Sequence, residues 1–193
     1  MPGRAVTMPI PSNVLRELQE VGRDLYQLGL VTSHGGNLSV RDQLGMWITG
    51  TGTMLGRLQE RHISHVSQDG RHAGPPPSSD TVLHQAIYAV SGANAVAHAH
   101  PRHAIALSFE TDCFVPGDLE GQLHLKDVPI IAVGPHSTEQ IAHALSSRLV
   151  VLLRGHGAYA RGQTLWEALH WATALEESAH IAVIRRGLGH QGD

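Results

Sequence analysis

The sequence has little cysteine, no long apolar run and no excess of charge of one sign. Cys113 is the only cysteine among 193 residues, so the chain cannot form an internal disulfide, and we expect a reducing cytoplasm as its location. Lysine and arginine (14) nearly balance aspartate and glutamate (17), and no basic run argues for nucleic acid or a membrane surface as a partner. The longest aliphatic stretch, 149–153, is too short to span a membrane, and 1–13 hold no apolar core of a secretory signal.

The residue present in excess is histidine, with 15 copies. Composition alone selects none of them as a functional group, so spacing and context must do so. A chain of this length with 41% hydrophobic content can bury a substantial core without needing to divide. We therefore expect a single domain over 1–193.

Apolar spacing and turn residues predict a mixture of helices and strands. Helices are expected over 12–29, 55–60, 79–90, 102–108, 137–147 and 164–185, with Ser12, Ser79 or Asp80, Ser137 and Thr164 as caps. Strands are expected over 37–41, 46–49, 63–67, 95–100, 128–133 and 149–153. Because the two types are mixed along the chain, a sheet covered by helices is favoured.

Three histidines stand in the settings that best suit a metal ion. His98 and His100 end an apolar run and are two residues apart, so on a strand both face the same side. His156 lies between two glycines directly after another apolar run. Three nitrogen ligands would leave a fourth position open, as in a catalytic metal site. A chance His-x-His in a histidine-rich chain is the alternative.

Other polar positions have a plain structural explanation and a functional one. Pro77-Ser78-Ser79-Asp80 can simply cap a helix, or it can bind an anion at the helix N-terminus with Asp80 as a general base. The loops 35–37 and 49–52 are ordinary glycine turns or backbone anion sites. The turn 116–121 is usually a solvated loop, but its place between two predicted strands makes Glu120 a candidate site residue.

Taken in order, these motifs resemble the class II aldolase/adducin family, whose members include sugar-phosphate aldolases and pentulose-phosphate epimerases. The resemblance runs from about 14 to about 188. It is carried by Gly-Gly-Asn-Leu-Ser (35–39), Ile-Thr-Gly-Thr-Gly (48–52), Pro-Ser-Ser-Asp (77–80), His-Ala-His-Pro (98–101), Gly-His-Gly (155–157) and Leu-Glu-Glu-Ser-Ala (175–179).

The resemblance implies an α/β fold, a three-layer αβα sandwich with a mostly antiparallel central sheet. It also implies a homotetramer with active sites at subunit interfaces and a bound Zn²⁺, or another divalent ion such as Co²⁺ or Mn²⁺. His98, His100 and His156 match the family's metal ligands, and Asp80 matches its catalytic acid/base. The family's phosphate-binding positions correspond to Gly36, Asn37, Thr51, Gly52, Ser78 and Ser79.

The function that the resemblance implies is a metal-dependent lyase that cleaves a phosphorylated ketose by a retro-aldol reaction through a metal-bound enediolate. The acid/base is Glu in the aldolases and Asp here, as in the epimerases. The catalytic tyrosine of the family's C-terminal tail is missing, and Tyr26, Tyr88 and Tyr159 do not match its place. We therefore expect either Glu120 or water as the proton donor, or a reaction that differs from those of the aldolases and the epimerases.

Several alternatives use the same fold. A pentulose-phosphate 4-epimerase shares the metal and the enediolate, and a decarboxylase or dehydratase can use the same scaffold. An adducin-like interaction module without catalysis is the alternative of another class, although three convergent histidines argue against it. No glutamate stands beside the histidines on one helix, which disfavours a zinc hydrolase.

Overall fold

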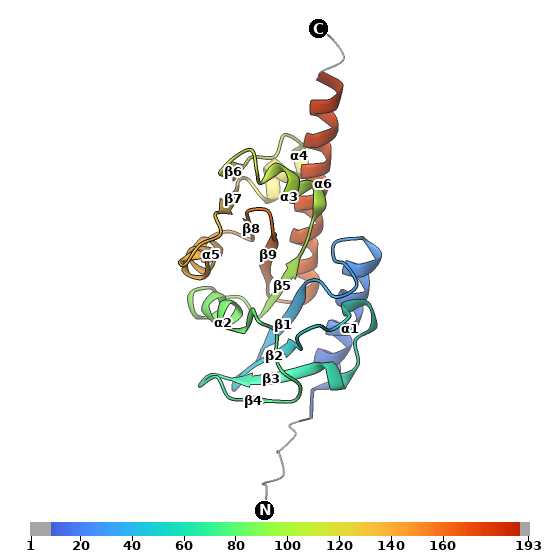
Figure 1. The fold of residues 1–193 in the computed structure, drawn as a ribbon, viewed down its shortest axis with the longest axis vertical. Coiled ribbons are helices and arrows are strands. Elements are labelled where there is room, and N and C mark those ends of the chain that lie inside the picture. The colour runs from blue at the N-terminus through green and yellow to red at the C-terminus, as the bar shows by residue number, and fades with distance from the viewer. Residues whose placement is uncertain (1–8, 190–193) are drawn as a thin grey trace, which may run out of the picture.

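The computed structural model describes residues 9–189, which build one nine-stranded sheet with helices on both faces (Figure 1). The strands are β1 (Asn37–Arg41), β2 (Gly45–Thr49), β3 (Ile63–Ser67), β4 (His72–Ala73), β5 (Ala95–Ala99), β6 (Cys113–Phe114), β7 (Val128–Ile131), β8 (Val150–Leu153) and β9 (Gly157–Gly162). The helices are α1 (Ser12–Gln27), α2 (Thr81–Val90), α3 (Arg102–Leu107), α4 (Leu119–His124), α5 (Ser137–Leu145) and α6 (Leu165–Gly189), with 3₁₀ turns η1 (Leu55–Arg57) and η2 (Glu60–His62).

The strand order is β4-β3-β2-β1-β5-β9-β8-β7-β6. Within residues 9–189 only the β7–β8 pair is parallel, and every other neighbouring pair is antiparallel. The prediction of a mostly antiparallel sheet is therefore confirmed. β5 is the central strand of this order, and it pairs with β1 along one edge and with β9 along the other.

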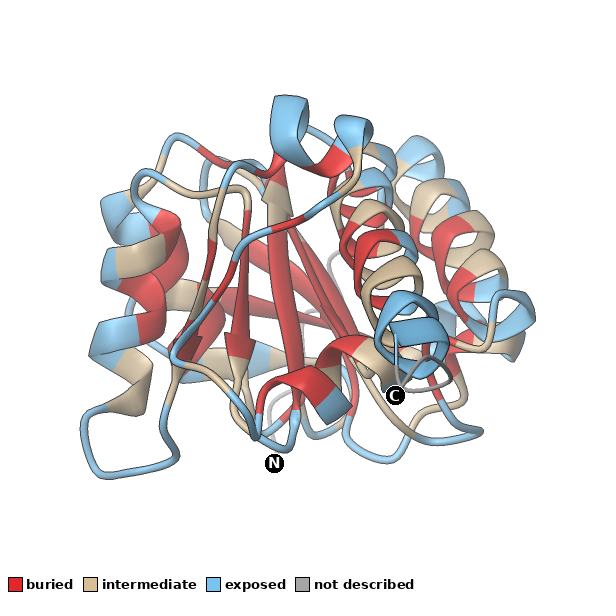
Figure 2. Ribbon diagram, turned by 90° about the horizontal axis from the view of Figure 1, so that it is seen from above, coloured by how far each residue is buried: buried red, intermediate tan, exposed pale blue. Residues whose placement is uncertain are grey.

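Two apolar cores separate the layers, and each belongs to one face of the sheet. On one face α1, α3 and α6 cover Ala95, Ala97 and other residues of alternating strand positions. On the other face α2 and α5 cover Val96 and its equivalents. Figure 2 shows the buried residues gathered on the strands and on the helix faces turned toward them. This arrangement confirms the three-layer sandwich.

The structure also corrects several local expectations. Ser12 and Ser137 are the first helical residues of α1 and α5, and the cap positions before them are Pro11 and His136. Neither cap makes a side-chain hydrogen bond. The predictions missed β9, the short strands β4 and β6, and α4, which begins within the predicted loop 116–121. No helix among residues 9–189 is both long enough and apolar enough to cross a membrane.

Candidate metal centre

The three predicted histidines converge on one point. The Nε2 atom of His98 lies 3.0 Å from that of His100 and 3.1 Å from that of His156. All three ligand atoms lie within 4.8 Å of one another, and no other such group of histidine, cysteine or acidic residues occurs in the described part of the chain. His98 is buried, His100 is half-buried and His156 is exposed, so the cluster is open on one side.

Backbone geometry brings the imidazoles together. His98 lies in β5 and His100 just beyond its end, while His156 lies in the tight turn between β8 and β9. At two glycines beside the cluster, other segments of the same chain approach so closely that a side chain could not fit. A Cβ atom at Gly157 would lie 2.5 Å from the carbonyl oxygen of Ala99 and 2.7 Å from the His100 ring, and one at Gly36, whose φ is +76°, would lie 2.6 Å from the carbonyl oxygen of His98.

The donor set fits a divalent transition metal. The Nδ1–H of His98 donates to the carbonyl oxygen of Ala158, 3.0 Å away, which leaves the Nε2 lone pair facing the other histidines. Two of the three nitrogen pairs lie 3.0 and 3.1 Å apart, close enough for these histidines to share one zinc ion. Burial lowers the pKa of His98 to about 3, and burial with His156 lowers that of His100, so both are neutral ligands at pH 7.

The Asp80 side chain lies beside this cluster and does not cap α2, which is the structural role that the sequence suggests for it. It occupies the N-cap position, yet its side chain makes no capping bond, and Ser78 Oγ accepts a hydrogen bond from the Asp80 amide instead. The carboxylate oxygen Oδ2 accepts from Asn37 Nδ2 at 2.9 Å and lies 4.0 Å from His98 Nε2. Burial alone would raise the pKa of Asp80, but the Asn37 hydrogen bond and the neighbouring His98 outweigh it, so the pKa is lowered.

Tyr159 is a residue of this site that the sequence analysis missed. Its hydroxyl donates to Asp80 Oδ2 at 3.0 Å, and its ring stacks on that of His98 with centroids 4.1 Å apart. Tyr159 does not match the tyrosine of the family's C-terminal tail, and the sequence pattern predicts no strand around it. A strand over 157–162 paired with 95–99 would have placed Tyr159 opposite His98.

The predicted phosphate-binding residues lie on two loops that meet. Gly50 pairs with Pro77 in an isolated bridge, and the Thr51 hydroxyl donates to the Pro77 carbonyl at 2.7 Å. This joins Thr51 and Gly52 to Ser78 and Ser79 at the start of α2. The same loop borders a cavity of about 440 Å³, whose lining includes Arg57, Arg61 and His62.

Asn37 and Gly36 connect this region to the histidines. Asn37 pairs with His98 across β1 and β5. Its amide donates to Asp80, and its buried Oδ1 has no partner among the described residues.

Glu120 is in different surroundings. It lies in the first turn of α4, its side chain is 79% exposed, and its ion pair is with His124 at 3.4 Å. No hydrogen bond or ion pair within residues 9–189 joins Glu120 to the histidines or to Asp80. A role for Glu120 stays a prediction.

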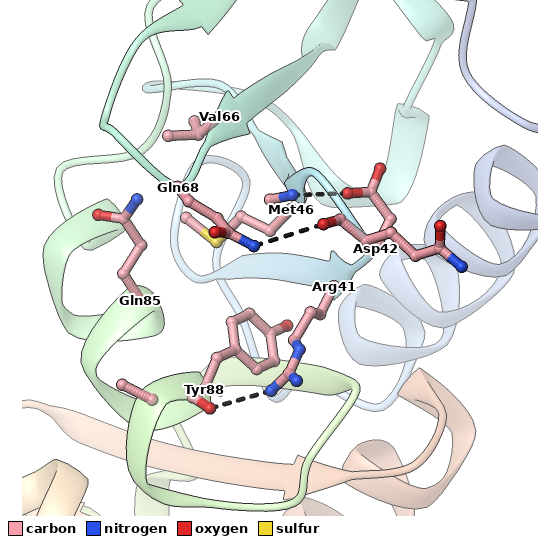
Figure 3. A pocket seen from close by; sticks show the side chains of 10 residues that line it. Arg41, Asp42, Met46, Val66, Gln68, Gln85 and Tyr88 are labelled. Carbon is pink, nitrogen blue, oxygen red and sulfur yellow. Dashed lines mark hydrogen bonds between the residues drawn. The ribbon is translucent and has the colours of Figure 1, made fainter.

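A separate cavity of about 590 Å³ lies at the opposite end of β1 (Figure 3). Arg41 and Asp42 border it, and Arg41 donates to the carbonyl oxygen of Tyr88 at 3.0 Å. The Asp42 carboxylate accepts hydrogen bonds from the backbone amides of Leu44 and Gly45 and also contacts the His65 ring. Asp42 and Arg41 therefore stabilise the β1–β2 turn and its contacts with the middle of β3 and with α2.

Known proteins resemble this chain over most of its length. Residues 16–183 match the family described as Class II Aldolase and Adducin N-terminal domain. The L-fuculose phosphate aldolase of Methanococcus vannielii is 31% identical over 86% of this chain and 94% of its own length. That of Escherichia coli K12 is 32% identical over 88% and 82%.

Solved structures agree with the sequence comparison. The crystal structure of L-fuculose-1-phosphate aldolase from Thermus thermophilus superposes with a TM-score of 0.89, at 36% identity, over 95% of this chain and 99% of that one. The family match, the sequence identities and the structural superposition all extend over most of the chain. The chain belongs to the class II aldolase and adducin family.

Proposed function

We propose that the protein is a metal-dependent aldolase that cleaves a phosphorylated ketose by a retro-aldol reaction. The observation that carries the proposal is the convergence of three histidine Nε2 atoms beside one carboxylate, with Asp80 Oδ2 4.0 Å from His98 Nε2. The names of the relatives favour an aldolase over an epimerase, a decarboxylase or a dehydratase. L-Fuculose 1-phosphate is the first substrate to test for the same reason.

His98, His100 and His156 would hold the metal ion, Zn²⁺ or a similar divalent cation such as Co²⁺ or Mn²⁺. When bound, such an ion supplies Lewis-acid stabilisation of the negative charge that develops on substrate oxygens as the carbon–carbon bond breaks. The three histidines support this role because His98 and His100 are neutral at pH 7 and the cluster is open on one side.

Asp80 would move the proton. Its pKa is lowered, so the carboxylate is ionised at neutral pH and can accept a proton from a substrate hydroxyl and return it to the product. Asn37 and Tyr159 hold it in place, and both donate to the same oxygen. A fixed base within reach of the reacting atoms lowers the entropic cost of the proton transfer.

The phosphate would be held by Gly36, Asn37, Thr51, Gly52, Ser78 and Ser79. The first turn of α2 offers backbone N–H groups and the positive end of the helix dipole, which favour a dianion. Arg57 and Arg61 border the cavity next to the Thr51–Gly52 loop and add positive charge there. Anchoring the phosphate fixes the distance of the reacting carbons from Asp80.

The family resemblance also supports self-association into a homotetramer with active sites between subunits. Phe109, Val115, Leu119 and Leu123 are large apolar side chains, and all of them are at least 60% exposed. Large apolar side chains with this exposure are available to a subunit interface. A cytoplasmic location stays a prediction.

A substrate panel with an inactive control tests the proposal. We expect the metal-loaded protein to cleave a ketose 1-phosphate to dihydroxyacetone phosphate and an aldehyde. Asp80→Asn should lower kcat by about 10²–10⁴-fold, because it removes the proton carrier, and should keep the metal. Asp69→Asn, at an exposed turn, serves as the matched control and should stay active.

Three results would contradict the proposal. Absence of cleavage of every ketose phosphate by the metal-loaded protein would remove the aldolase. Rearrangement of a pentulose phosphate without net cleavage would establish the epimerase. A chain that takes up no metal under replete conditions would favour the adducin-like module.

A further inference from the structure

Three residues on neighbouring strands form one row across the sheet beneath Asp80. Asn37 of β1 pairs with His98 of β5, and His98 pairs with Tyr159 of β9. Directly paired residues point to the same face of a sheet. Asp80 comes from the start of α2, which covers that face, so its carboxylate lies over the central member of the row.

The two outer members of the row hold the same atom. Asn37 Nδ2 and the Tyr159 hydroxyl donate to Asp80 Oδ2 at 2.9 and 3.0 Å. The other oxygen, Oδ1, accepts no hydrogen bond within the described chain and is not among its buried unpartnered atoms. One oxygen is therefore fixed from two sides, and the other remains open to a ligand.

We propose that Tyr159 is the positioning residue of the proton carrier, directing the free oxygen of Asp80 toward the substrate. This inference rests on the proposed function for its kinetic consequence. Tyr159 is only 2% exposed, so its hydroxyl acts through Asp80. Its ring also rests on His98, which couples the carboxylate and the central imidazole to one rigid side chain.

The pairing is specific for the short acid of this chain. Glutamate at position 80 is one methylene longer than aspartate, and its carboxylate would have to shift from the place where Asn37 and Tyr159 hold that of Asp80. Tyrosine at 159 and aspartate at 80 therefore form a matched pair. The loss of kcat caused by a substitution at one position should therefore depend on the residue at the other. At independent sites the two losses would multiply.

The kinetic test compares Tyr159→Phe with Tyr88→Phe in the metal-loaded protein. The first keeps the stacked ring and removes the bond to Asp80, so we expect kcat to fall about 10- to 100-fold while KM changes less than about threefold. Metal content should not change. Tyr88→Phe also removes a buried hydroxyl, one that bonds to Ser39 away from Asp80, and should leave kcat unchanged.

A double-mutant cycle tests the matched pair. Asp80→Glu alone should be impaired, and Asp80→Glu with Tyr159→Phe should be at least as active as Asp80→Glu. Multiplying losses in the double variant would overturn the inference. So would wild-type kcat in Tyr159→Phe, or a loss that appears in KM or metal content, because either points to a purely structural role.

A crystallographic readout is independent of activity. In metal-loaded crystals of Tyr159→Phe we expect the Asp80 carboxylate to leave its wild-type position, while the Tyr88→Phe crystals retain it. An unmoved Asp80 would overturn the inference. If the wild-type protein cleaves no sugar phosphate, the proposed function fails, and this structural comparison alone decides the role of Tyr159.

Discussion

The carbonyl oxygen of Ala158 decides which nitrogen of His98 is available to a metal. Because Nδ1–H donates to that carbonyl, Nε2 carries the lone pair and faces His100 and His156. His98 Nε2 has no proton to donate and lies 3.0 and 3.1 Å from the Nε2 atoms of His100 and His156, so both neighbours compete for its single lone pair. A cation removes this conflict, so its binding should also stabilise the fold.

His100→Ala tests that coupling. Zinc at about 100 times its Kd should stabilise the wild-type protein by about 2.7 kcal/mol, a rise of several degrees in Tm. His100→Ala should show no such rise, because two histidines remain, and its metal-free Tm should stay close to that of the wild type. Thermal unfolding with and without zinc measures both, and His72→Ala, an exposed histidine, is the control. A zinc-dependent rise in His100→Ala would contradict the ligand assignment.

Spacing in the sequence predicted which histidines meet, and it could not predict the hydroxyl that holds Asp80. His98 and His100 are two residues apart on a strand, so their common direction follows from local geometry. Tyr159 meets Asp80 across 79 positions of sequence, because β9 pairs with β5 and α2 packs on the same face of the sheet. Asp80 itself had two explanations, a cap or a site residue, and its hydrogen bonds favour the site.

Elements were predictable where apolar periodicity or turn residues mark them. The strands 37–41 and 63–67 have the predicted bounds, and α2, α3 and α5 lie within about two residues of theirs. β9 was missed because Gly-Ala-Tyr-Ala-Arg-Gly has small residues facing one core and Tyr159 facing the other, which gives no polar–apolar alternation. α4 was missed because it is six residues long and contains Gly121.

The packing of α2 on β1 buries a histidine that the proposed reaction does not use. His84 Nδ1 lies 2.7 Å from Ser39 Oγ, and its buried Nε2 has no partner among the described residues. Burial lowers the pKa of His84 to about 4 from 6.5. Below about pH 6.5 the His84 ring is therefore protonated in the unfolded chain, whereas in the folded protein it stays neutral down to about pH 4.

This difference predicts acid sensitivity of the metal-free protein. Between about pH 6.5 and 4 the unfolded state binds the additional proton, so the free energy of unfolding falls as pH falls. His84→Gln should reduce that slope by about 1.4 kcal/mol per pH unit, the contribution of one proton. Urea unfolding at pH 7, 6 and 5 measures it, with the exposed His143→Gln as control. Equal slopes for wild type and His84→Gln would show that His84 titrates normally.

At the scale of the whole molecule, one chain brings together most residues of the proposed site. Glu120, the predicted proton donor, lies elsewhere on the surface. The histidines, Asp80 and Tyr159 lie together around β5. Glu120 is exposed on α4, next to the apolar side chains of Leu119 and Leu123. If active sites lie between subunits, Glu120 on this exposed surface would serve the site of a neighbouring subunit.

Mixed oligomers distinguish this arrangement from a site within one chain. Glu120→Gln and Asp80→Asn should each be nearly inactive alone. If Glu120 serves a neighbour's site, random co-assembly of equal amounts pairs an intact Asp80 with an intact Glu120 in about one quarter of sites. Activity should recover to that fraction after dissociation and joint refolding, and light scattering should show an oligomer. A fully active Glu120→Gln would remove Glu120 from the site, and mixtures without recovery would show that Glu120 and Asp80 act within one chain.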